Sequence, residues 1–428
     1  MDLKAQRGWL ITKIKPSDYR LFLKLAFILC FELNIKGSSM RFNLISIRLL
    51  FLTFLLMIGP LSEAKKLGQF SYNKSCIQTL KLNKVQSRSD DSFEEITKVL
   101  PATVWPVGAI ENVTFMELNF LNLISRKLAE NIKDGKKLAR SGYHEFAKPL
   151  YQLQGVARLI KKHKPMFILG IEIETLKILQ DFDSEFVNDQ YEELLIEGND
   201  PRGIDVALLV RKDLPLEIKA KSHKNLVDST TGTLVFSRDL PAYSIYEKGN
   251  SEPLLTIFGT HFKSQRDSDG DPRSVKKRTL QVQAASLIIS DYEKQFPNVP
   301  ILISGDFNND VRTAKEFDSL KEIGLRDAFD ISTGLTVPME NRGTHFYFGG
   351  NGEATVSQLD ANFFNKVAIL QKIVKSAQIL SFINENGDDY PVPNTYKERE
   401  RLPSDHRATL LILDLSKKDF ISKKQKAS

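Results

Sequence analysis

The chain contains 428 residues, of which 42% are hydrophobic and 26% are charged. These values exclude a fibrous or an intrinsically disordered chain and allow a large buried core. The formal net charge of +7 comes from the two ends, because residues 1–64 contain nine Lys and Arg against four Asp and Glu, and residues 416–428 contain five Lys against one Asp. The body between them is near −2, so the basic overall charge is no evidence for nucleic-acid binding.

Two apolar stretches lie near the N-terminus, Leu21–Ile35 and Leu49–Leu61. Each is shorter than the roughly 18 to 20 residues that a membrane span needs. The second has the pattern of an export signal, with a basic start, an uninterrupted apolar run and a small-x-small end. We therefore expect translation from Met40, cleavage after Ala64, and export to the periplasm or the medium, with residues 1–39 as an upstream extension. The alternative is an uncleaved N-terminal membrane anchor.

Residues 65–110 are polar and turn-rich, and the sequence assigns them no role beyond a lead-in. From residue 111 to 416, short β-rich runs alternate with amphipathic stretches, which is typical of a single α/β domain. The expected strands are Val113–Leu118, Phe167–Ile173, Ile204–Val210, Leu254–Phe262, Val299–Ile303 and Thr409–Leu415. The expected helices are Phe120–Lys137, Pro149–His163, Lys276–Gln295 and Thr313–Ile323. Residues 417–428 form a basic tail.

Polar residues stand at or beside the ends of several predicted strands. They are Asn119, Glu172, His261, Asp306 and Asp405. Loops at strand ends collect ligand-binding groups over a rigid sheet, so these five residues predict a shared functional rim.

The segment after the predicted strand Val299–Ile303 reads Ser-Gly-Asp-Phe-Asn. The two-residue period of a strand places Asp306 and Asn308 on one face. Such a pair can orient an attacking water and stabilise charge on a phosphate oxygen. The alternative is an exposed turn, because Gly, Asp and Asn are common turn residues.

Two histidines are candidates for the same chemistry. His406 follows Asp405, and an adjacent carboxylate either raises the basicity of the ring or holds a metal while the histidine contacts phosphate. His261 ends the predicted strand Leu254–Phe262, where it is either a catalytic group or a histidine satisfied within the core.

Glu172 interrupts an apolar run that looks buried. An unpaired buried carboxylate costs several kcal/mol, a cost that a hard cation would remove. Glu174 shares the same face of the strand, so the residues alone leave both glutamates open as the ligand.

Seven phrases occur in an order that resembles the endonuclease/exonuclease/phosphatase superfamily, which includes pancreatic-type deoxyribonuclease, and in particular its exported bacterial branch. They are Val113–Leu123, Pro165–Glu174, Asp200–Leu209, Thr260–Ser264, Gly305–Asn308, Gln358–Asp360 and Ser404–His406. Met166, Ala361 and Asn362 depart from the usual pattern, but none is a residue that the family uses at its site.

The resemblance implies an α/β fold of four layers, an αββα sandwich in which two packed mixed β-sheets are flanked by helices. It implies a Mg²⁺ or Mn²⁺ cofactor with Asn119, Glu172 and Asp405 as metal-site residues. The implied protein is a monomer.

The same resemblance assigns the catalytic roles. Asp306 orients or deprotonates the attacking water, and Asn308 and His261 hydrogen-bond phosphate oxygens. His406 stabilises the transition state or moves a proton, and Asp360 supports one of the histidines.

The leading prediction for the substrate is DNA, with RNA as a further nucleic-acid substrate, cut by an exported metal-dependent phosphodiesterase. The basic residues within Arg266–Arg278 would contact phosphates, although the segment also reads as a solvated loop of mixed charge. The alternatives are a sphingomyelinase-like lipid phosphodiesterase acting on membrane lipid, a phosphatase of small phosphoesters and, last, an inactive binding module.

Overall fold

The computed structural model describes residues 95–132, 139–268, 270–349 and 352–416. The predicted start at Met40, the cleavage after Ala64 and the basic tail lie outside these residues. Within the described part of the chain, no helix combines the length and the apolar character that crossing a membrane requires.

One mixed sheet has seven strands, and only its neighbours β8 and β9 run parallel. In spatial order the strands are β1 (Glu95–Val99), β6 (Leu216–Lys221), β7 (Ala242–Glu247), β8 (Leu255–His261), β9 (Ile301–Asp306), β13 (Asp360–Phe364) and β10 (Arg326–Asp327). The strand β1 lies before the predicted domain start at residue 111, so the sheet begins earlier in the chain than the sequence pattern indicates.

The second mixed sheet has six strands, and here only β2 and β3 run parallel. In spatial order they are β14 (Val374–Ile379), β15 (Thr409–Leu413), β2 (Val113–Leu123), β3 (Phe167–Ile173), β5 (Asp205–Arg211) and β4 (Tyr191–Leu195). A separate hairpin pairs β11 (His345–Phe348) with β12 (Ala354–Ser357).

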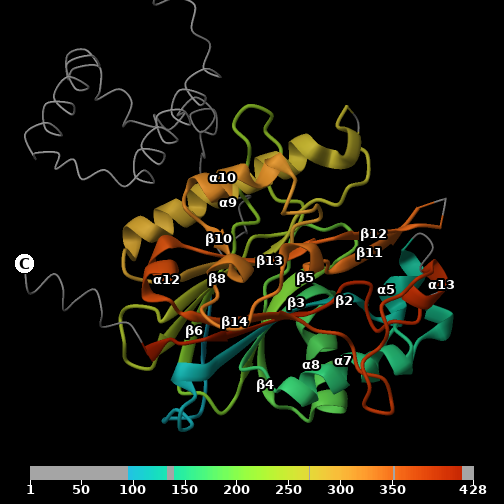
Figure 1. Cartoon of the computed structure of the whole chain (residues 1–428), viewed down its shortest axis with the longest axis horizontal. Helices are drawn as coiled ribbons and strands as arrows, with labels where there is room; N and C mark the ends of the chain where they lie inside the picture. Colours follow the sequence, from blue (N-terminus) through green and yellow to red (C-terminus); the bar gives the residue numbers. More distant parts are fainter. Residues whose placement is uncertain (1–94, 133–138, 269, 350–351, 417–428) are drawn as a thin grey trace, which may run out of the picture. The chain divides into compact units, whose positions relative to one another are not determined.

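The two sheets pack face to face through apolar side chains such as Phe115 and Leu169 from one sheet and Ile257 and Leu302 from the other. Helices α7 (Leu150–His163) and α8 (Leu176–Phe182) cover the outer face of the six-stranded sheet. Helices α9 (Val275–Gln295) and α10 (Asp318–Glu322) cover the outer face of the seven-stranded sheet (Figure 1). The shorter helices are α5 (Arg126–Asn131), α11 (Ala328–Ile331), α12 (Lys366–Gln371) and α13 (Tyr396–Arg399). The predicted four-layer sandwich is confirmed.

All six predicted strands form, but two predicted helices differ. The helix expected over Phe120–Lys137 is wrong, because β2 continues to Leu123 and only Arg126–Asn131 is helical among the described residues of that stretch. The helix expected over Thr313–Ile323 is reduced to a 3-10 turn followed by α10. Pairing with β3 extends β2 beyond its helix-like sequence pattern, since tertiary context overrides weak local preference.

Gly305 allows β8 and β9 to approach closely just before the site. Its φ is 134°, and a Cβ at this position would lie 2.0 Å from the carbonyl oxygen of Thr260 on β8. Both the backbone conformation and the space therefore require glycine.

Gly305→Ala is expected to lower the free energy of unfolding by about 3 kcal/mol through backbone strain and overpacking. Gly249→Ala is the control, because Gly249 also has a positive φ but nothing lies near its absent Cβ. That control is expected to cost only about 1 kcal/mol. Urea unfolding of both variants measures the difference, and equal losses would contradict the steric argument.

Candidate active site

The strand ends bring the predicted site residues to one edge of the two sheets. In the parallel pair β8 and β9, His261 lies opposite Asp306, and in the antiparallel pair β9 and β13, Asp306 lies opposite Asp360. These two strand pairings therefore place three predicted catalytic residues, His261, Asp306 and Asp360, side by side.

Glu172 occupies an irregularity in β3. Its φ is 67°, and the register of β3 shifts around this residue against both neighbouring strands. Such a bulge re-aims a side chain, and a non-glycine residue in the left-handed region is strained. The Glu172 carboxylate accepts a hydrogen bond of 2.9 Å from the Asn122 backbone. Burial, together with the nearby carboxylate of Asp405, raises the pKa of Glu172.

The structure separates the roles of Glu172 and Glu174. Both carboxylate oxygens of Glu174 accept hydrogen bonds from Ser125, one from its backbone and one from its hydroxyl. Since Ser125 also caps the start of α5, Glu174 has a structural function. Glu172 keeps oxygen lone pairs available for a ligand.

Asp306 is held from two directions by Asn308. The Asn308 backbone donates to Asp306 Oδ1 at 2.7 Å, and the Asn308 side-chain amide donates to Asp306 Oδ2 at 3.0 Å. The same amide nitrogen donates to the Phe262 carbonyl at 3.0 Å, so both of its hydrogens are engaged. Burial and the neighbouring Asp360 raise the pKa of Asp306 to about 7, against the opposing effect of His406. In this arrangement Asn308 positions the carboxylate and offers a ligand only its amide oxygen.

His261 lies between two of the carboxylates. Its Nε2 is 3.6 Å from Asp306 Oδ2 and 3.9 Å from Glu172 Oε1, distances longer than a hydrogen bond. Burial and the nearby cations Arg238 and Arg202 lower the pKa of His261 well below its usual value, which favours the neutral ring.

His406 and Asp360 form a buried pair. The ring Nδ1 lies 3.0 and 2.8 Å from the two oxygens of Asp360. Burial lowers the pKa of His406, but the carboxylates of Asp360 and Asp306 outweigh it and raise that pKa well above its usual value. The backbone of Asp360 is itself fixed by a hydrogen bond of 3.0 Å to the Thr344 hydroxyl. Asp360 therefore supports His406, which decides between the two histidines that it could have supported.

The residues predicted to hold a metal fit a hard cation. Asn119 is buried, and its Oδ1 accepts one hydrogen bond from the Leu121 backbone and keeps a second lone pair for a cation, whereas its Nδ2, which has no partner among the described residues, is a donor that no cation can bind. Glu172 and Asp405 are close enough for the charge of one to raise the pKa of the other's carboxyl. Carboxylate and amide oxygens are the ligands that Mg²⁺ prefers, and a cation would relieve the buried negative charge.

Three further residues at the site were missed by the sequence analysis. Glu117 is fully buried behind Asp360, and Lys148 is buried with its ammonium donating to the Leu121 carbonyl at 3.2 Å. Burial lowers the pKa of Lys148 to about 8, while the charges of Asp405 and Glu172 act in the opposite direction. Glu117 interrupts an apolar strand as Glu172 does, so the same signal could have found it.

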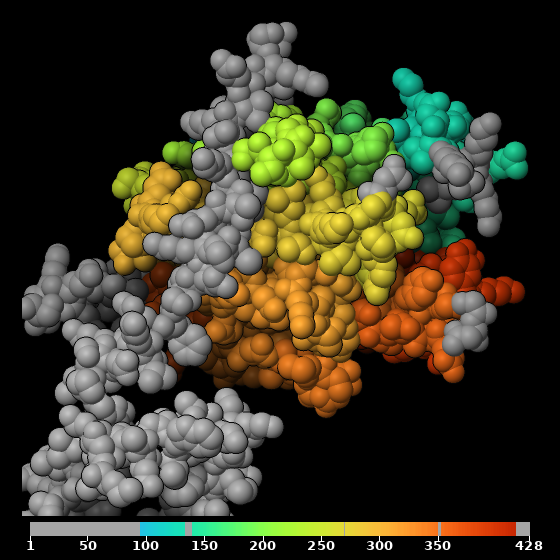
Figure 2. Space-filling view, turned by 90° about the horizontal axis from the view of Figure 1, so that it is seen from above, coloured from blue at the N-terminus to red at the C-terminus, as the bar shows by residue number. Residues whose placement is uncertain are grey.

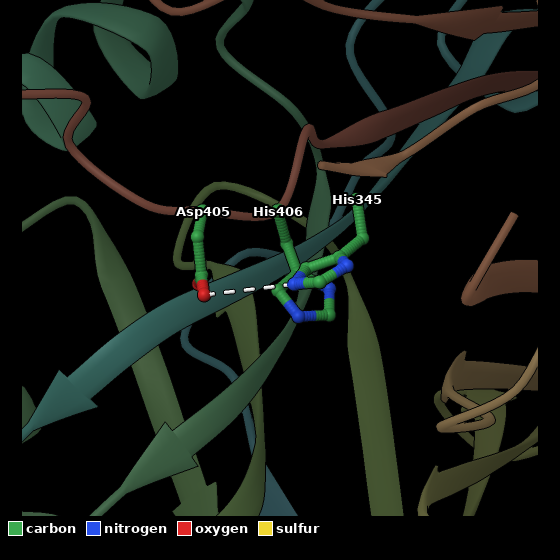
Figure 3. A group of neighbouring side chains, drawn as sticks. All are labelled: His345, Asp405 and His406. Carbon is green, nitrogen blue, oxygen red and sulfur yellow. Dashed lines mark ion pairs between the residues drawn. The ribbon is translucent and has the colours of Figure 1, made fainter. Parts of the chain in front are cut away.

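The third missed residue is His345, which begins the hairpin strand β11 and pairs by its backbone with His406. No pattern in the sequence connects two residues so far apart. Figure 3 shows His345 beside His406 and Asp405.

A cleft of about 770 Å³ opens beside this cluster. Asn308, His345 and His406 line it, together with Arg266 and Tyr347, and none of the described lining residues is Asp or Glu. Its walls come from the segment after β8 and from the hairpin of β11 and β12, coloured yellow and orange in Figure 2, where both lie on one face. The electrostatics of this cleft favour an anionic ligand.

A family model described as the endonuclease/exonuclease/phosphatase family matches residues 130–383. The chain belongs to this family, and it is therefore a hydrolase of phosphoester bonds. The matched span includes Glu172, His261, Asp306 and Asp360, whereas Asn119 and His406 lie outside it.

Solved structures with a similar fold include an endonuclease/exonuclease/phosphatase from Bacteroides vulgatus, 16% identical, with a TM-score of 0.44, covering 71% of this chain and 98% of that chain. Truncated TDP2 from Caenorhabditis elegans is 16% identical, with a TM-score of 0.46 and coverage of 71% and 97%. A mannosyl-6-phosphatase from Bacteroides thetaiotaomicron is 15% identical, with a TM-score of 0.39 and coverage of 70% and 99%. No curated protein sequence matches the chain significantly.

Proposed function

We propose that the chain is an exported, divalent-metal-dependent phosphodiesterase that hydrolyses DNA, and RNA as a further substrate, by attack of water. Export is supported by the signal pattern between Met40 and Ala64. The phosphodiester chemistry is supported by the buried cluster of Asp306, His261 and His406, of which His406 lines the cleft.

The observation that carries the nucleic-acid substrate is the composition of the cleft. Beyond His406 the cleft extends between Arg266 and Tyr347, and Tyr347 is 58% exposed. Guanidinium groups contact backbone phosphates, and an exposed ring can stack on a base. A small phosphoester would leave both of these groups without a partner.

In the proposed mechanism each side chain has its own role. Asp306, held by Asn308, orients the water and accepts its proton. His406, held by Asp360, donates a hydrogen bond or a proton to the phosphate oxygens, and neutral His261 donates one from the other side. Asp306 and His406 are each held by a hydrogen-bonded neighbour before substrate binds, which lowers the cost of reaching the transition state.

The metal site proposed for this reaction consists of Glu172, Asn119 and Asp405. A Mg²⁺ or Mn²⁺ ion there supplies charge neutralisation at the phosphate. Without an ion, Lys148 and His406 are buried groups whose positive charge acts on both Glu172 and Asp405.

The substrate is tested by incubating the chain with supercoiled plasmid, RNA, sphingomyelin and a phosphorylated sugar, each with Mg²⁺ and with a chelator. The proposal predicts Mg²⁺-dependent cleavage of the plasmid. Cleavage of sphingomyelin alone or of the sugar phosphate alone would contradict it.

Arg266→Ala tests whether the cleft wall contacts the nucleic-acid backbone. Loss of one phosphate contact is expected to raise the KM for DNA several-fold and to reduce the slope of log KM against log salt by about one. The rate on bis(p-nitrophenyl) phosphate, which is too small to reach the wall, is expected to stay unchanged. Lys161→Ala on the exposed side of α7 is the matched control, and an equal effect of both variants would contradict a local contact.

A lipid phosphodiesterase is the second candidate. The hairpin of β11 and β12 exposes Tyr347 and Val356, the kind of side chains that enter a membrane interface. The sphingomyelin arm of the substrate experiment decides between the two.

A further inference from the structure

Two imidazoles and a carboxylate meet at the edge of the cleft. His345, Asp405 and His406 each offer one ligand atom, and these three atoms lie within 4.8 Å of one another. Figure 3 shows the Asp405 carboxylate directed toward the two rings, and the centroids of the rings are 4.7 Å apart. The closest approach to the carboxylate is made by His345 Nε2, at 3.7 Å from Asp405 Oδ2.

The orientation of His406 is the one that metal-binding histidines adopt. Its Nδ1 is bonded to the Asp360 carboxylate, which leaves Nε2, 4.0 Å from Asp306 Oδ2, as the nitrogen that would bind a metal in exchange for its proton. Histidines that ligate metals nearly always donate their other ring N–H to a carboxylate or a carbonyl, because this fixes the tautomer and increases the basicity of the ligand.

The backbone holds His345 in place beside this ring. His345 is the first residue of β11, and its backbone forms an antiparallel bridge with His406. Its side chain is 14% exposed and lines the cleft. The competing partner of Asp405 is Arg399, whose Nη1 is 3.9 Å from Oδ2, which is longer than a hydrogen bond. The carboxylate is therefore not committed to that arginine.

We propose that His345, Asp405 and His406 bind a divalent transition-metal ion, above all Zn²⁺, at a site that shares only Asp405 with the proposed Mg²⁺ ligands around Glu172 and adds two imidazoles to it. Two imidazoles with one carboxylate favour transition metals, whereas carboxylate and amide oxygens alone favour Mg²⁺. For metal–ligand bonds of about 2.0 to 2.2 Å, the distances between the three ligand atoms must shorten by roughly 1 Å. This movement is within reach of two side chains that line an open cleft.

Binding at this site has a consequence for the proposed reaction. An ion on His406 Nε2 occupies the atom that the proposed function assigns to the phosphate oxygens. Zn²⁺ is therefore expected to inhibit Mg²⁺-dependent cleavage. Metal binding itself does not depend on the proposed substrate, so the two hypotheses fail separately.

The test compares the full chain with the variants His345→Ala and His163→Ala, the latter removing a histidine at the end of α7. Zn²⁺ affinity is measured by competition with a chromophoric chelator in the presence of Mg²⁺, and Co²⁺ binding is followed by its visible absorption. His345→Ala is expected to weaken Zn²⁺ binding at least tenfold and to change the Co²⁺ spectrum, while His163→Ala matches the wild type.

His345→Asp is a second variant for the case in which His345→Ala does not fold. Its carboxylate keeps one ligand oxygen at this position. This variant is expected to retain Mn²⁺ binding while losing the preference for Zn²⁺. Wild-type Zn²⁺ affinity in a folded His345→Ala variant would overturn the proposal, as would equal losses in His345→Ala and His163→Ala. If Zn²⁺ binds through His345 but no nucleic acid is cleaved, the metal site holds and the proposed substrate is wrong.

Discussion

Asp306→Asn is expected to lower kcat for phosphodiester cleavage by about a thousandfold, because it removes the group proposed to orient the water and accept its proton. Asparagine has almost the same shape and can still accept the hydrogen bond from the Asn308 backbone. The loss should therefore appear in kcat with little change in KM, since the substrate contacts on the cleft wall are intact.

Asp205→Asn is the matched control for this variant. Asp205 is also buried, and burial raises its pKa to about 7 as it does for Asp306. However, its carboxylate accepts a hydrogen bond from the Gly198 backbone, whereas Asp306 Oδ2 lies 3.6 Å from His261 Nε2 and 4.0 Å from His406 Nε2. The control is expected to retain nearly full kcat. A loss of kcat in both variants would show that removal of any buried carboxylate disturbs the fold, and near-normal kcat in Asp306→Asn would remove Asp306 from the mechanism.

Glu172→Gln is expected to lower Mg²⁺-dependent activity by on the order of a hundredfold or more and to raise the Mg²⁺ concentration needed for half-maximal rate. The neutral amide keeps one oxygen ligand but loses the charge that attracts the cation. Because the buried charge is also relieved, the free energy of unfolding without metal is expected to be unchanged or increased.

Glu174→Gln separates metal binding from support of the fold. Both oxygens of Glu174 bind Ser125, so this variant is expected to lose stability at the start of α5 while keeping its Mg²⁺ dependence. Calorimetric titration with Mg²⁺ and thermal unfolding of both variants measure the two effects. Equal Mg²⁺ affinity in Glu172→Gln and the wild type would exclude Glu172 as the ligand.

Local pattern and the order of motifs along the chain were enough to predict part of the fold and part of the site. Strand ends followed by polar residues led to His261 and Asp306, and the ordered phrases led to the four-layer fold. The residues alone left Glu172 and Glu174 open, and only the family resemblance named Glu172, because the physical difference between them depends on the bulge in β3 and on the contacts of Ser125.

Other features depend on long-range packing. Asp360 is separated from His406 by 46 residues, and nothing local indicates which histidine it supports. The predicted helix from Phe120 was wrong because its apolar spacing also suits a strand buried on both faces.

A buried polar chain also joins the two sheets behind the site. Ser304 on β9 donates to Asn362 on β13, Asn362 donates to Thr409 on β15, and Thr409 lies 3.4 Å from Glu117 on β2. These contacts fix the sheets relative to each other at the depth of Asp360. The carboxylate of Glu117 ends this chain, with its other oxygen, Oε1, buried and without a hydrogen-bond partner among the described residues.

The central claim is that the rim formed by Glu172, Asp306 and His406 is a metal-dependent phosphodiesterase site. The most direct test is the hydrolysis rate of bis(p-nitrophenyl) phosphate by the purified chain and by Asp306→Asn, with Mg²⁺ and with a chelator. The account predicts hydrolysis by the wild type with Mg²⁺ only, and almost none by the variant under either condition. Hydrolysis that persists with the chelator, or that Asp306→Asn leaves unchanged, would contradict it.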